Sequence, residues 1–398
     1  MTKRIAAIGA AALLALSLIA SVQQFSGVRD NLLPSGQALG GDFIAFHAAA
    51  VAAREGAAAE PYDLDAFEPR LKSYVPPREE FLLTWQYPPT YYLLILPLAF
   101  FPFALGYAAW VAAGLGVYFG AMRALGVSYF ALFVMLASPS ALHAVITGQN
   151  GFFTAALLGI AALLPDRRPI VAGLAAALLT VKPQLGVLLP IAFAAGGCWR
   201  AFGVASAGAA LLAVASLAIF GAGAWTAFAT SAMEATSNLA EGAMPIHKMA
   251  TPYSAALLLG APAAVAATIC ALFACGAAFA VALVWRRVRD AELRAIALLC
   301  GAFMVAPYTY YYELVILALP LALIARRAAL SGWLPGEMAL IALIFILPMF
   351  LPAGLKSVGV SLGFVAAALA ALVAVRRVAH EEPHAFRFAI VAPQPQSG

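Results

Sequence analysis

The residues best suited to chemistry are charged and amide side chains that interrupt long apolar stretches. Asp42 follows two glycines, and Lys182 precedes Pro183 within a nearly uncharged run, 169–196. A lysine inside such a run costs roughly 2.5–3.5 kcal/mol on membrane-insertion scales, so a partner is expected. A carboxylate can accept a proton from a hydroxyl group, and cations can stabilise a leaving phosphate. Further candidates are Tyr87, Gln149, Asn150, His247, Lys248 and Glu313.

Each candidate also has a structural interpretation. Asp42 could cap the Ala-rich helix that is predicted to follow it and to end near Gly56. Lys182 could extend its ammonium group to water, although the helix break at the next residue favours a functional role. Substrate contact competes with helix capping or ordinary loop charge at four positions, namely Gln149, Asn150, His247 and Lys248. Tyr87 could serve only as an aromatic anchor at the membrane interface, and Glu313 could be only an interfacial acid.

Composition identifies the class of protein. The chain has 398 residues, of which 64% are hydrophobic and 10% charged. Soluble proteins carry about 45–50% apolar and about 25% charged residues, so a soluble enzyme, a secreted disulfide scaffold and a disordered chain are excluded. The four cysteines lack ligand spacing and are interpreted as small apolar packing residues. The sequence therefore predicts an all-α polytopic membrane protein.

The distribution of basic residues predicts the topology. A transmembrane helix needs about 20 apolar residues, and thirteen apolar runs are candidates. If the run 90–101 is a re-entrant or surface helix, 15 basic residues lie on the cytoplasmic side and 8 on the outer side. Five of the 8 belong to the long first loop, and the positive-inside rule applies only to short loops. The first run, 5–24, follows Lys3 and Arg4 and could be a signal peptide. It lacks an A-x-A-like cleavage site, which favours a retained transmembrane span. We therefore predict twelve spans with both termini cytoplasmic.

The predicted organisation has two membrane regions and a tail. A first region, 1–261, contains seven spans and two outer loops, 26–103 and 221–261. Residues 262–375 are predicted to form five further transmembrane helices with few polar groups, which provide a lipid-facing wall. Residues 376–398 are predicted to be a short disordered cytoplasmic tail.

Six stretches between about residues 40 and 325 resemble those of a known family, and they occur in the order expected for it. They read GGDFIAFHAAAVAAREG with PYD, QYPPTYYLLILPLAFFPFALGYAAW, TGQNGFFTAALL, DRRPIVAGLAAALLTVKPQLGVLLPIA, HKMATPYSAALLLG and PYTYYYELVILALPLA. Together they resemble the bacterial GT-C-fold glycosyltransferases of family 87, which are similar to polyprenol-phosphate-mannose-dependent α-mannosyltransferases. The resemblance implies a GT-C fold, in which residues 1–261 form a seven-span catalytic core with a long first extracytoplasmic loop. The later helices, 262–375, are then expected to guide the polyprenyl chain of the donor.

The resemblance also implies a reaction. A sugar, mannose in the best-known members, is transferred with inversion from a polyprenyl-phosphate donor to a lipid or glycan acceptor at the outer face of the bacterial inner membrane. Asp42 matches the acid of the family by position and is expected to be the general base. Lys182, His247 and Lys248 are expected to bind the donor phosphate. Contacts to sugar or acceptor are expected from Tyr87, Gln149, Asn150 and Glu313, the last standing where the family pattern has an Asp.

No nucleotide or other cofactor is expected, because the donor is lipid-linked and the chain has no Gly-rich phosphate loop. The acids show no pair at the spacing typical of Mg²⁺ or Mn²⁺ ligation, which leaves a divalent metal open. The expected partners are the donor lipid, the acceptor and the bilayer, and no nucleic acid is expected.

Other classes of protein stay open at this point. A transporter or flippase usually has repeats and charged or broken helices at mid-membrane, whereas the polar residues here gather on the predicted outer side. A polymerase or ligase of lipid-linked glycans also has about twelve spans, but its large loop usually comes late in the chain. A non-catalytic scaffold would be favoured only if a variant without Asp42 behaved normally.

The topology is testable with cysteines introduced at positions 70 and 387 and an impermeant thiol reagent. We expect labelling at position 70 in intact cells, and labelling at position 387 only after the membrane is permeabilised. Labelling of position 387 in intact cells would contradict the predicted topology.

Overall fold

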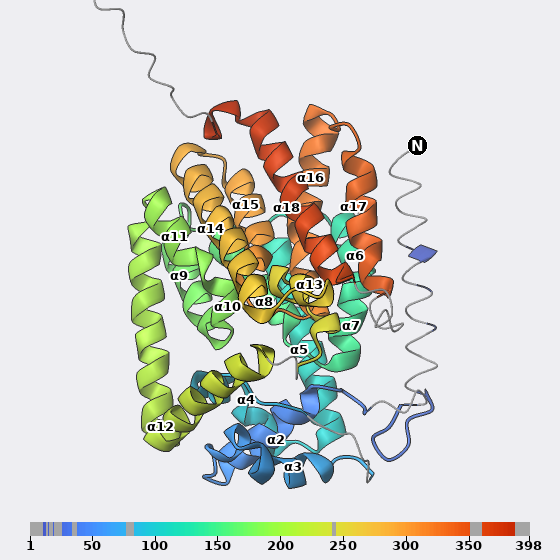
Figure 1. The fold of residues 1–398 in the computed structure, drawn as a ribbon, viewed down its shortest axis with the longest axis vertical. Coiled ribbons are helices and arrows are strands. Elements are labelled where there is room, and N and C mark those ends of the chain that lie inside the picture. The colour runs from blue at the N-terminus through green and yellow to red at the C-terminus, as the bar shows by residue number, and fades with distance from the viewer. Residues whose placement is uncertain are drawn as a thin grey trace, which may run out of the picture.

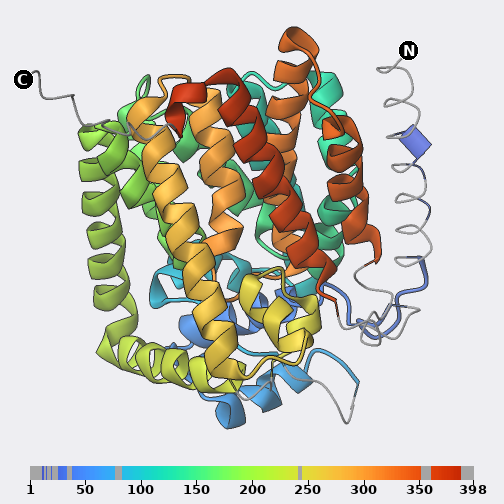
Figure 2. The ribbon, with the colours of Figure 1, turned by 45° about the horizontal axis from the view of Figure 1, so that its top comes forward.

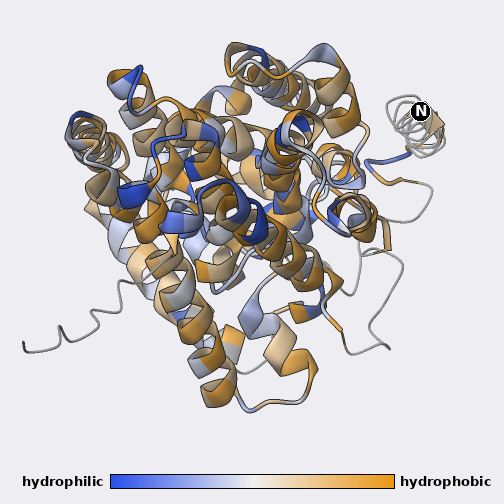
Figure 3. Cartoon of the chain, turned by 90° about the horizontal axis from the view of Figure 1, so that it is seen from above, coloured by the Kyte–Doolittle hydropathy of each residue, from blue (hydrophilic) through white to orange (hydrophobic). Residues whose placement is uncertain are grey.

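The structure is a computed structural model in which all regular secondary structure is helical among the residues described. It describes residues 11–12, 15, 19, 26–33, 38–76, 83–240, 244–350 and 360–386. Strand-like pairing within these ranges is limited to isolated bridges, such as the one between Met249 and Tyr310. Hydrophobic residues cover most of the helical ribbon (Figure 3). The predicted all-α class is therefore confirmed for the described residues.

Five helical stretches in the described part of the chain are long and apolar enough to cross a membrane. They are α5 (Phe103–Ala124), the Trp199–Ala235 part of α12, α14 (Ala263–Arg287), η6 (Tyr311–Leu317) with α16 (Ala318–Ser331), and α18 (Leu362–Glu381). The pair α6 (Tyr129–Leu136) and α7 (Pro139–Thr147) is bent by 60° and would be a sixth span if counted as one. The predicted count of twelve is not confirmed, and the first predicted span, 5–24, lies largely outside the described residues.

Several predicted spans form apolar helices of only 10–17 residues. These are α8 (Gly151–Leu163), α9 (Pro169–Leu178) with η4 (Leu179–Val181), α10 (Pro183–Gly186) with α11 (Leu188–Gly196), and α17 (Glu337–Ile346) with η7 (Leu347–Phe350). The helical run from α9 to α11 breaks at Lys182, as the sequence predicts. Pro183 has no N–H to donate and its ring clashes with the preceding turn, so the helix cannot continue through it.

The first long loop forms a helical layer at one end of the bundle (Figure 1). This layer contains α2 (Phe43–Arg54), α3 (Leu64–Lys72), η2 (Pro89–Tyr91), α4 (Tyr92–Ile95) and η3 (Leu96–Phe100). The Ala-rich helix predicted after Asp42 is α2, and its end before Gly56 is confirmed. Most of the run 90–101 lies in one short helical stretch, Pro89–Phe100, which packs against α2. Aromatic and alanine side chains fill the core of this layer.

Helix α12 (Trp199–Ala240) changes direction at Gly221, where the backbone has φ 80° and ψ 165°. Its first part runs along the bundle, and its second part turns across the end that carries the first-loop layer (Figure 2). The second part contacts this layer, for example where the rings of Phe228 and Tyr62 lie 5.9 Å apart. Residues 222–240 of the predicted outer loop, 221–261, continue as helix after the change of direction. The short helix α13 (Pro252–Leu258) follows.

The main hydrophobic core crosses the predicted boundary at residue 261. Its buried residues extend from Tyr118 to Ala385, and α15 (Ala291–Val305) is almost completely buried within it. Helix α15 packs against α8, α11, α14 and α18, which come from both halves of the chain. Residues 262–375 therefore contribute core helices, rather than only the lipid-facing wall that the sequence predicted.

The opposite end of the bundle carries ion pairs between arginines and acids. Arg377 on α18 is fully buried and pairs with Glu337, and Arg327 pairs with Glu381 at 2.5 Å. A buried arginine is tolerated when an acid compensates its charge. Helix α18 extends to Glu381, followed by η9 (Pro383–Ala385), so the prediction of a disordered tail is wrong for its first residues.

Candidate active site

Two glycine-containing turns, 40–42 and 147–150, lie against each other at the boundary between the first-loop layer and the bundle. Gly148 has φ +62°, a conformation that favours glycine. A Cβ atom on Gly148 would lie 2.5 Å from Cβ of Phe43 and 3.0 Å from a ring carbon of Tyr107. The close contact of the two turns therefore requires a residue without a side chain at this position.

This contact brings Asp42 and Gln149 together, although 107 positions separate them in sequence. Gln149 Nε2 donates a hydrogen bond to Asp42 Oδ2 at 2.7 Å. Asp42 and Asn150 stand at the N-cap positions of α2 and α8, but neither side chain makes a capping hydrogen bond. The capping interpretation is therefore wrong for both side chains, which instead bond to other polar groups.

A hydrogen-bond network continues from Gln149 to two stacked tyrosines. Tyr87 OH donates to Gln149 Oε1 at 3.2 Å, and Asn150 Nδ2 donates to Tyr91 OH at 2.9 Å. The rings of Tyr87 and Tyr91 are 4.3 Å apart, and burial raises the pKa of the Tyr87 hydroxyl well above its ordinary value. Asn150 Oδ1 is buried with no hydrogen-bond partner among the described residues. An unpaired buried acceptor is costly, so this oxygen is suited to a substrate hydroxyl group.

Lys182 has the buried partner that its position in an apolar run predicts. Its ammonium group pairs with Glu313, and the side chains are 5% and 4% exposed. The second carboxylate oxygen of Glu313 lies 3.4 Å from the Thr154 hydroxyl. The rings of Tyr87 and Tyr312 lie 5.6 and 5.4 Å from the ammonium nitrogen, within the range of cation–π attraction. The interpretations of Lys182 as a solvated lysine and of Glu313 as an interfacial acid are therefore wrong.

Glu313 reaches this position because η6 packs closely on the start of α8. A Cβ atom on Gly151 would lie 3.1 Å from both the Tyr312 carbonyl oxygen and a methyl group of Val315. The absence of a side chain at Gly151 thus lets η6 approach the helix that carries Thr154. The C-terminal half of the chain in this way supplies a charged residue to the site.

Lys248, at the end of η5 (Ile246–Lys248), is exposed, but the backbone after it is fixed by the C-terminal half. The Ala250 N–H donates at 2.6 Å to a carbonyl of the segment before η6. The hydroxyl of Ser361, which caps α18, donates to the Met249 carbonyl at 2.8 Å. Helix α18 therefore helps to position the segment that carries Lys248.

The electrostatics of the site centre on Asp42. Burial raises the pKa of Asp42, whereas the hydrogen bond from Gln149 and the positive charges of Lys248 and Lys182 act in the opposite direction. The arrangement thus provides one carboxylate that can accept a proton, with two cations near enough to influence it. His247 is partly buried next to Lys248, and its role in phosphate binding stays a prediction.

Sequence reasoning missed three members of the site, namely Tyr91, Thr154 and Tyr312. Thr154 lies four residues after Asn150 at the start of α8, a spacing that places both on one face of a helix. This spacing was the available signal for Thr154. Tyr312 is adjacent to the predicted Glu313, and Tyr91 follows Tyr87 by four positions. Among the described residues, no group of three or more His, Cys, Asp or Glu side chains could hold a metal ion.

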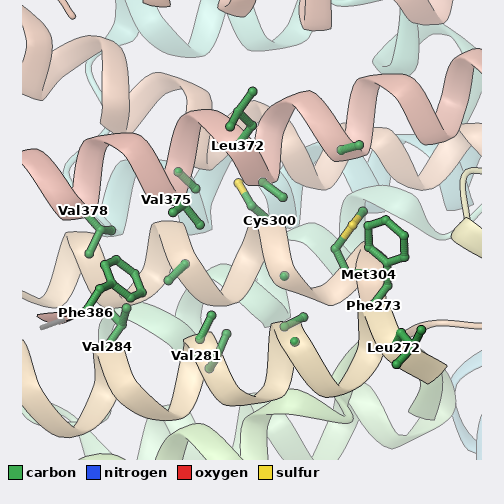
Figure 4. Close-up of a pocket in the computed structure, with 18 residues that line it drawn as sticks. Leu272, Phe273, Val281, Val284, Cys300, Met304, Leu372, Val375, Val378 and Phe386 are labelled. Atoms are coloured by element: carbon green, nitrogen blue, oxygen red, sulfur yellow. The ribbon is translucent and has the colours of Figure 1, made fainter. Parts of the chain in front are cut away.

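Two apolar cavities lie outside this hydrogen-bonded network. One of about 500 Å³ lies between α14, α15 and α18 and is lined by residues such as Phe273, Cys300 and Leu372 (Figure 4). A second, of about 270 Å³, lies between α9, α10, α11 and α12 and includes Thr180 and Pro183, on either side of Lys182 in sequence. Charged side chains line neither cavity, so neither is the site of the polar chemistry.

The helical architecture and the buried polar site define a membrane protein with a carboxylate and cations gathered at one end of its bundle. The family model Glycosyltransferase family 87 matches residues 85–307, more than half of the chain. The chain therefore belongs to glycosyltransferase family 87 and is a membrane glycosyltransferase. The matched range contains Lys182 and the turn 147–150 but neither Asp42 nor Glu313. No curated protein and no solved structure matches the chain.

Substitution of Gly148 tests the contact of the two turns. In Gly148→Ala the new methyl group would overlap with Phe43, so we expect a loss of stability of about 1–3 kcal/mol from overpacking, in addition to backbone strain. Gly126→Ala is the matched control, because Gly126 has φ +82° but no atom lies within 4 Å of the position that its new methyl group would occupy. Thermal unfolding in detergent measures both variants. Equal losses in the two would show that the turns are not in tight contact.

Proposed function

We propose that this glycosyltransferase transfers a sugar, with mannose as the first candidate, from a polyprenyl-phosphate donor to a lipid or glycan acceptor, with inversion. The observation that carries the proposal is the position of Asp42. Gln149 fixes one oxygen of this carboxylate, and two lysine charges act on it. A lipid-linked donor agrees with a polar site at one end of an apolar helical bundle.

Asp42 is the general base in this proposal. Its carboxylate accepts the proton of the acceptor hydroxyl while the acceptor oxygen bonds to the anomeric carbon. The bond from that carbon to the phosphate oxygen breaks on the opposite face, and the lipid phosphate leaves with the electron pair. The other carboxylate of the site, Glu313, is paired with Lys182 and with Thr154, which leaves Asp42 as the acid free for this role.

The cations stabilise the leaving group. Negative charge grows on the lipid phosphate in the transition state, and fixed positive charges lower the barrier. Lys182, His247 and Lys248 are the proposed phosphate ligands. The charges of Lys182 and Lys248 both act on Asp42, which supports their position around one reaction centre.

The sugar or acceptor binds against the tyrosines and amides. Stacked aromatic rings offer an apolar face to a sugar ring, and amide groups can bond to its hydroxyl groups. Tyr87, Gln149 and Asn150 are the proposed ligands, and the unpaired Oδ1 of Asn150 supports this role. Glu313 is proposed to face the same space through its contact with Lys182.

We also infer the GT-C architecture and the orientation. The site lies at the end of the bundle that carries the first-loop layer, and the arginine-rich ion pairs lie at the other end. An arginine-rich end is typical of the cytoplasmic side. This supports an extracytoplasmic active site in the bacterial inner membrane, with cytoplasmic termini.

The substitution Asp42→Asn tests the general base. Asn keeps the size of the side chain but cannot accept the proton, so we expect turnover to fall by about 10²–10⁴ while the protein still folds and binds donor lipid. The assay uses membranes and a panel of radiolabelled polyprenyl-phosphate sugars, scored for the sugar that is consumed.

Asp63→Asn is the control for this assay. Asp63 caps α3 through bonds from two backbone N–H groups, and Asn can also cap a helix, so activity should be retained. Near-normal turnover of Asp42→Asn would show that the base is elsewhere, and failure to consume any lipid-linked sugar by the wild type would contradict the donor class.

The pH profile tests the contact between Gln149 and Asp42. The hydrogen bond from Gln149 lowers the pKa of Asp42, so its removal in Gln149→Ala raises that pKa further. A general base works only when ionised, so the acidic limb of kcat/KM should move to higher pH. Asn150→Ala is the matched control, because Asn150 does not bond to Asp42. An unchanged acidic limb in Gln149→Ala would argue against Asp42 as the titrating base.

A further inference from the structure

The cation proposed to bind the donor phosphate is already neutralised in the structure. Lys182 forms an ion pair with Glu313, and both side chains are buried. A phosphate that binds to Lys182 must therefore take the place of the Glu313 carboxylate or share the ammonium group with it. This raises the question of what Glu313 contributes to a site that has to bind an anion.

We propose that Glu313 is a positioning residue that competes with the lipid phosphate for Lys182, so that Lys182 exchanges one counter-ion for the other in each catalytic cycle. The inference rests on the proposed function and assigns a regulatory role to the ion pair. Glu313 holds Lys182 in the resting site, releases it to the phosphate of the donor, and recovers it when the polyprenyl phosphate leaves.

The geometry supports an exchange, because each partner has a second interaction. The other carboxylate oxygen of Glu313 lies 3.4 Å from the hydroxyl of Thr154, which lies 3.0 Å from the Gly151 carbonyl as well. The ammonium group of Lys182 lies near the rings of Tyr87 and Tyr312, and these attract a cation wherever it moves over their faces. When the ion pair opens, Glu313 keeps a weak contact with the Thr154 hydroxyl and Lys182 keeps the two aromatic rings, so the donor phosphate has to compensate the rest of the lost attraction.

The charge balance of the reaction gives the exchange a purpose. Asp42 and Glu313 are negative and Lys182 and Lys248 are positive, so these four groups sum to zero. The donor phosphodiester adds one negative charge. After transfer the acceptor proton is on Asp42, and the lipid phosphate is a monoester with a charge of about −1.5 to −2 at pH 7. The polyprenyl phosphate product would therefore bind the cations more tightly than the donor does. Glu313 weakens this binding, because its carboxylate repels the phosphate and pairs again with Lys182.

The test measures binding of a short-chain polyprenyl phosphate, farnesyl phosphate, to the purified full-length protein in detergent, with farnesol as the uncharged control. For Glu313→Gln we expect the Kd of farnesyl phosphate to fall by about tenfold or more, because the like charge and the competitor are gone. Stronger inhibition by polyprenyl phosphate product should accompany this. Lys182→Met should weaken binding of farnesyl phosphate, and binding of farnesol should be unchanged in both variants.

Opposite shifts for the two variants would support the exchange. Unchanged or weaker binding of farnesyl phosphate by Glu313→Gln would overturn it and leave Glu313 as a ligand of the sugar. If Glu313→Gln does not fold, Glu313→Asp serves in its place, since the shorter acid draws the charge away from Lys182 and should tighten binding to a smaller extent. Wild-type protein that binds farnesyl phosphate no better than farnesol would contradict the proposed donor itself, and the exchange with it.

Discussion

The pairing of Lys182 with Glu313 is the interaction on which the arrangement of the site depends. A charge buried without a partner is strongly destabilising. The helix break places Lys182 in the interior, so its ammonium group needs a carboxylate there. That carboxylate comes from a segment 131 residues later in the chain. The ion pair therefore joins the break between α9 and α10 to η6. Helix α8, which lies against η6 through Gly151, is positioned by the same contact.

The position of α8 in turn determines the position of Asp42. The turn before α8 carries Gln149, and Gly148 lets that turn press against Phe43 at the start of α2. Gln149 then holds the carboxylate of Asp42, while the stacked tyrosines cover the other side of the network. A single set of contacts thus connects the proposed general base, the amides and the buried cation. The first-loop layer supplies Asp42, and the bundle supplies the groups that surround it.

The C-terminal helices are part of this arrangement. Helix α15 lies in the centre of the core, and the cap of α18 fixes the backbone next to Lys248. Glu313 also comes from this half. The helices after residue 261 therefore contribute both to the core and to the site of this glycosyltransferase. The ion pairs at the far end, such as that of Arg377 with Glu337, join α18 to α17 and so hold the same helices in place.

The sequence by itself determined the class of protein, the all-α fold, and most residues that the structure brings together in the candidate site. These properties are local: hydrophobicity fixes the solvent in which a helix is stable, Pro183 ends a helix, and a polar residue in an apolar run needs a partner. The identity of that partner could not be predicted, because Lys182 and Glu313 meet only through the packing of α8 on η6. The helical continuation of α12 beyond Gly221 and the burial of Arg377 were missed for the same reason. Hydropathy describes how apolar a segment is, but it does not say which segments pack against it. That packing decides whether a charge is paired and where a helix changes direction, and it is seen only in the tertiary structure.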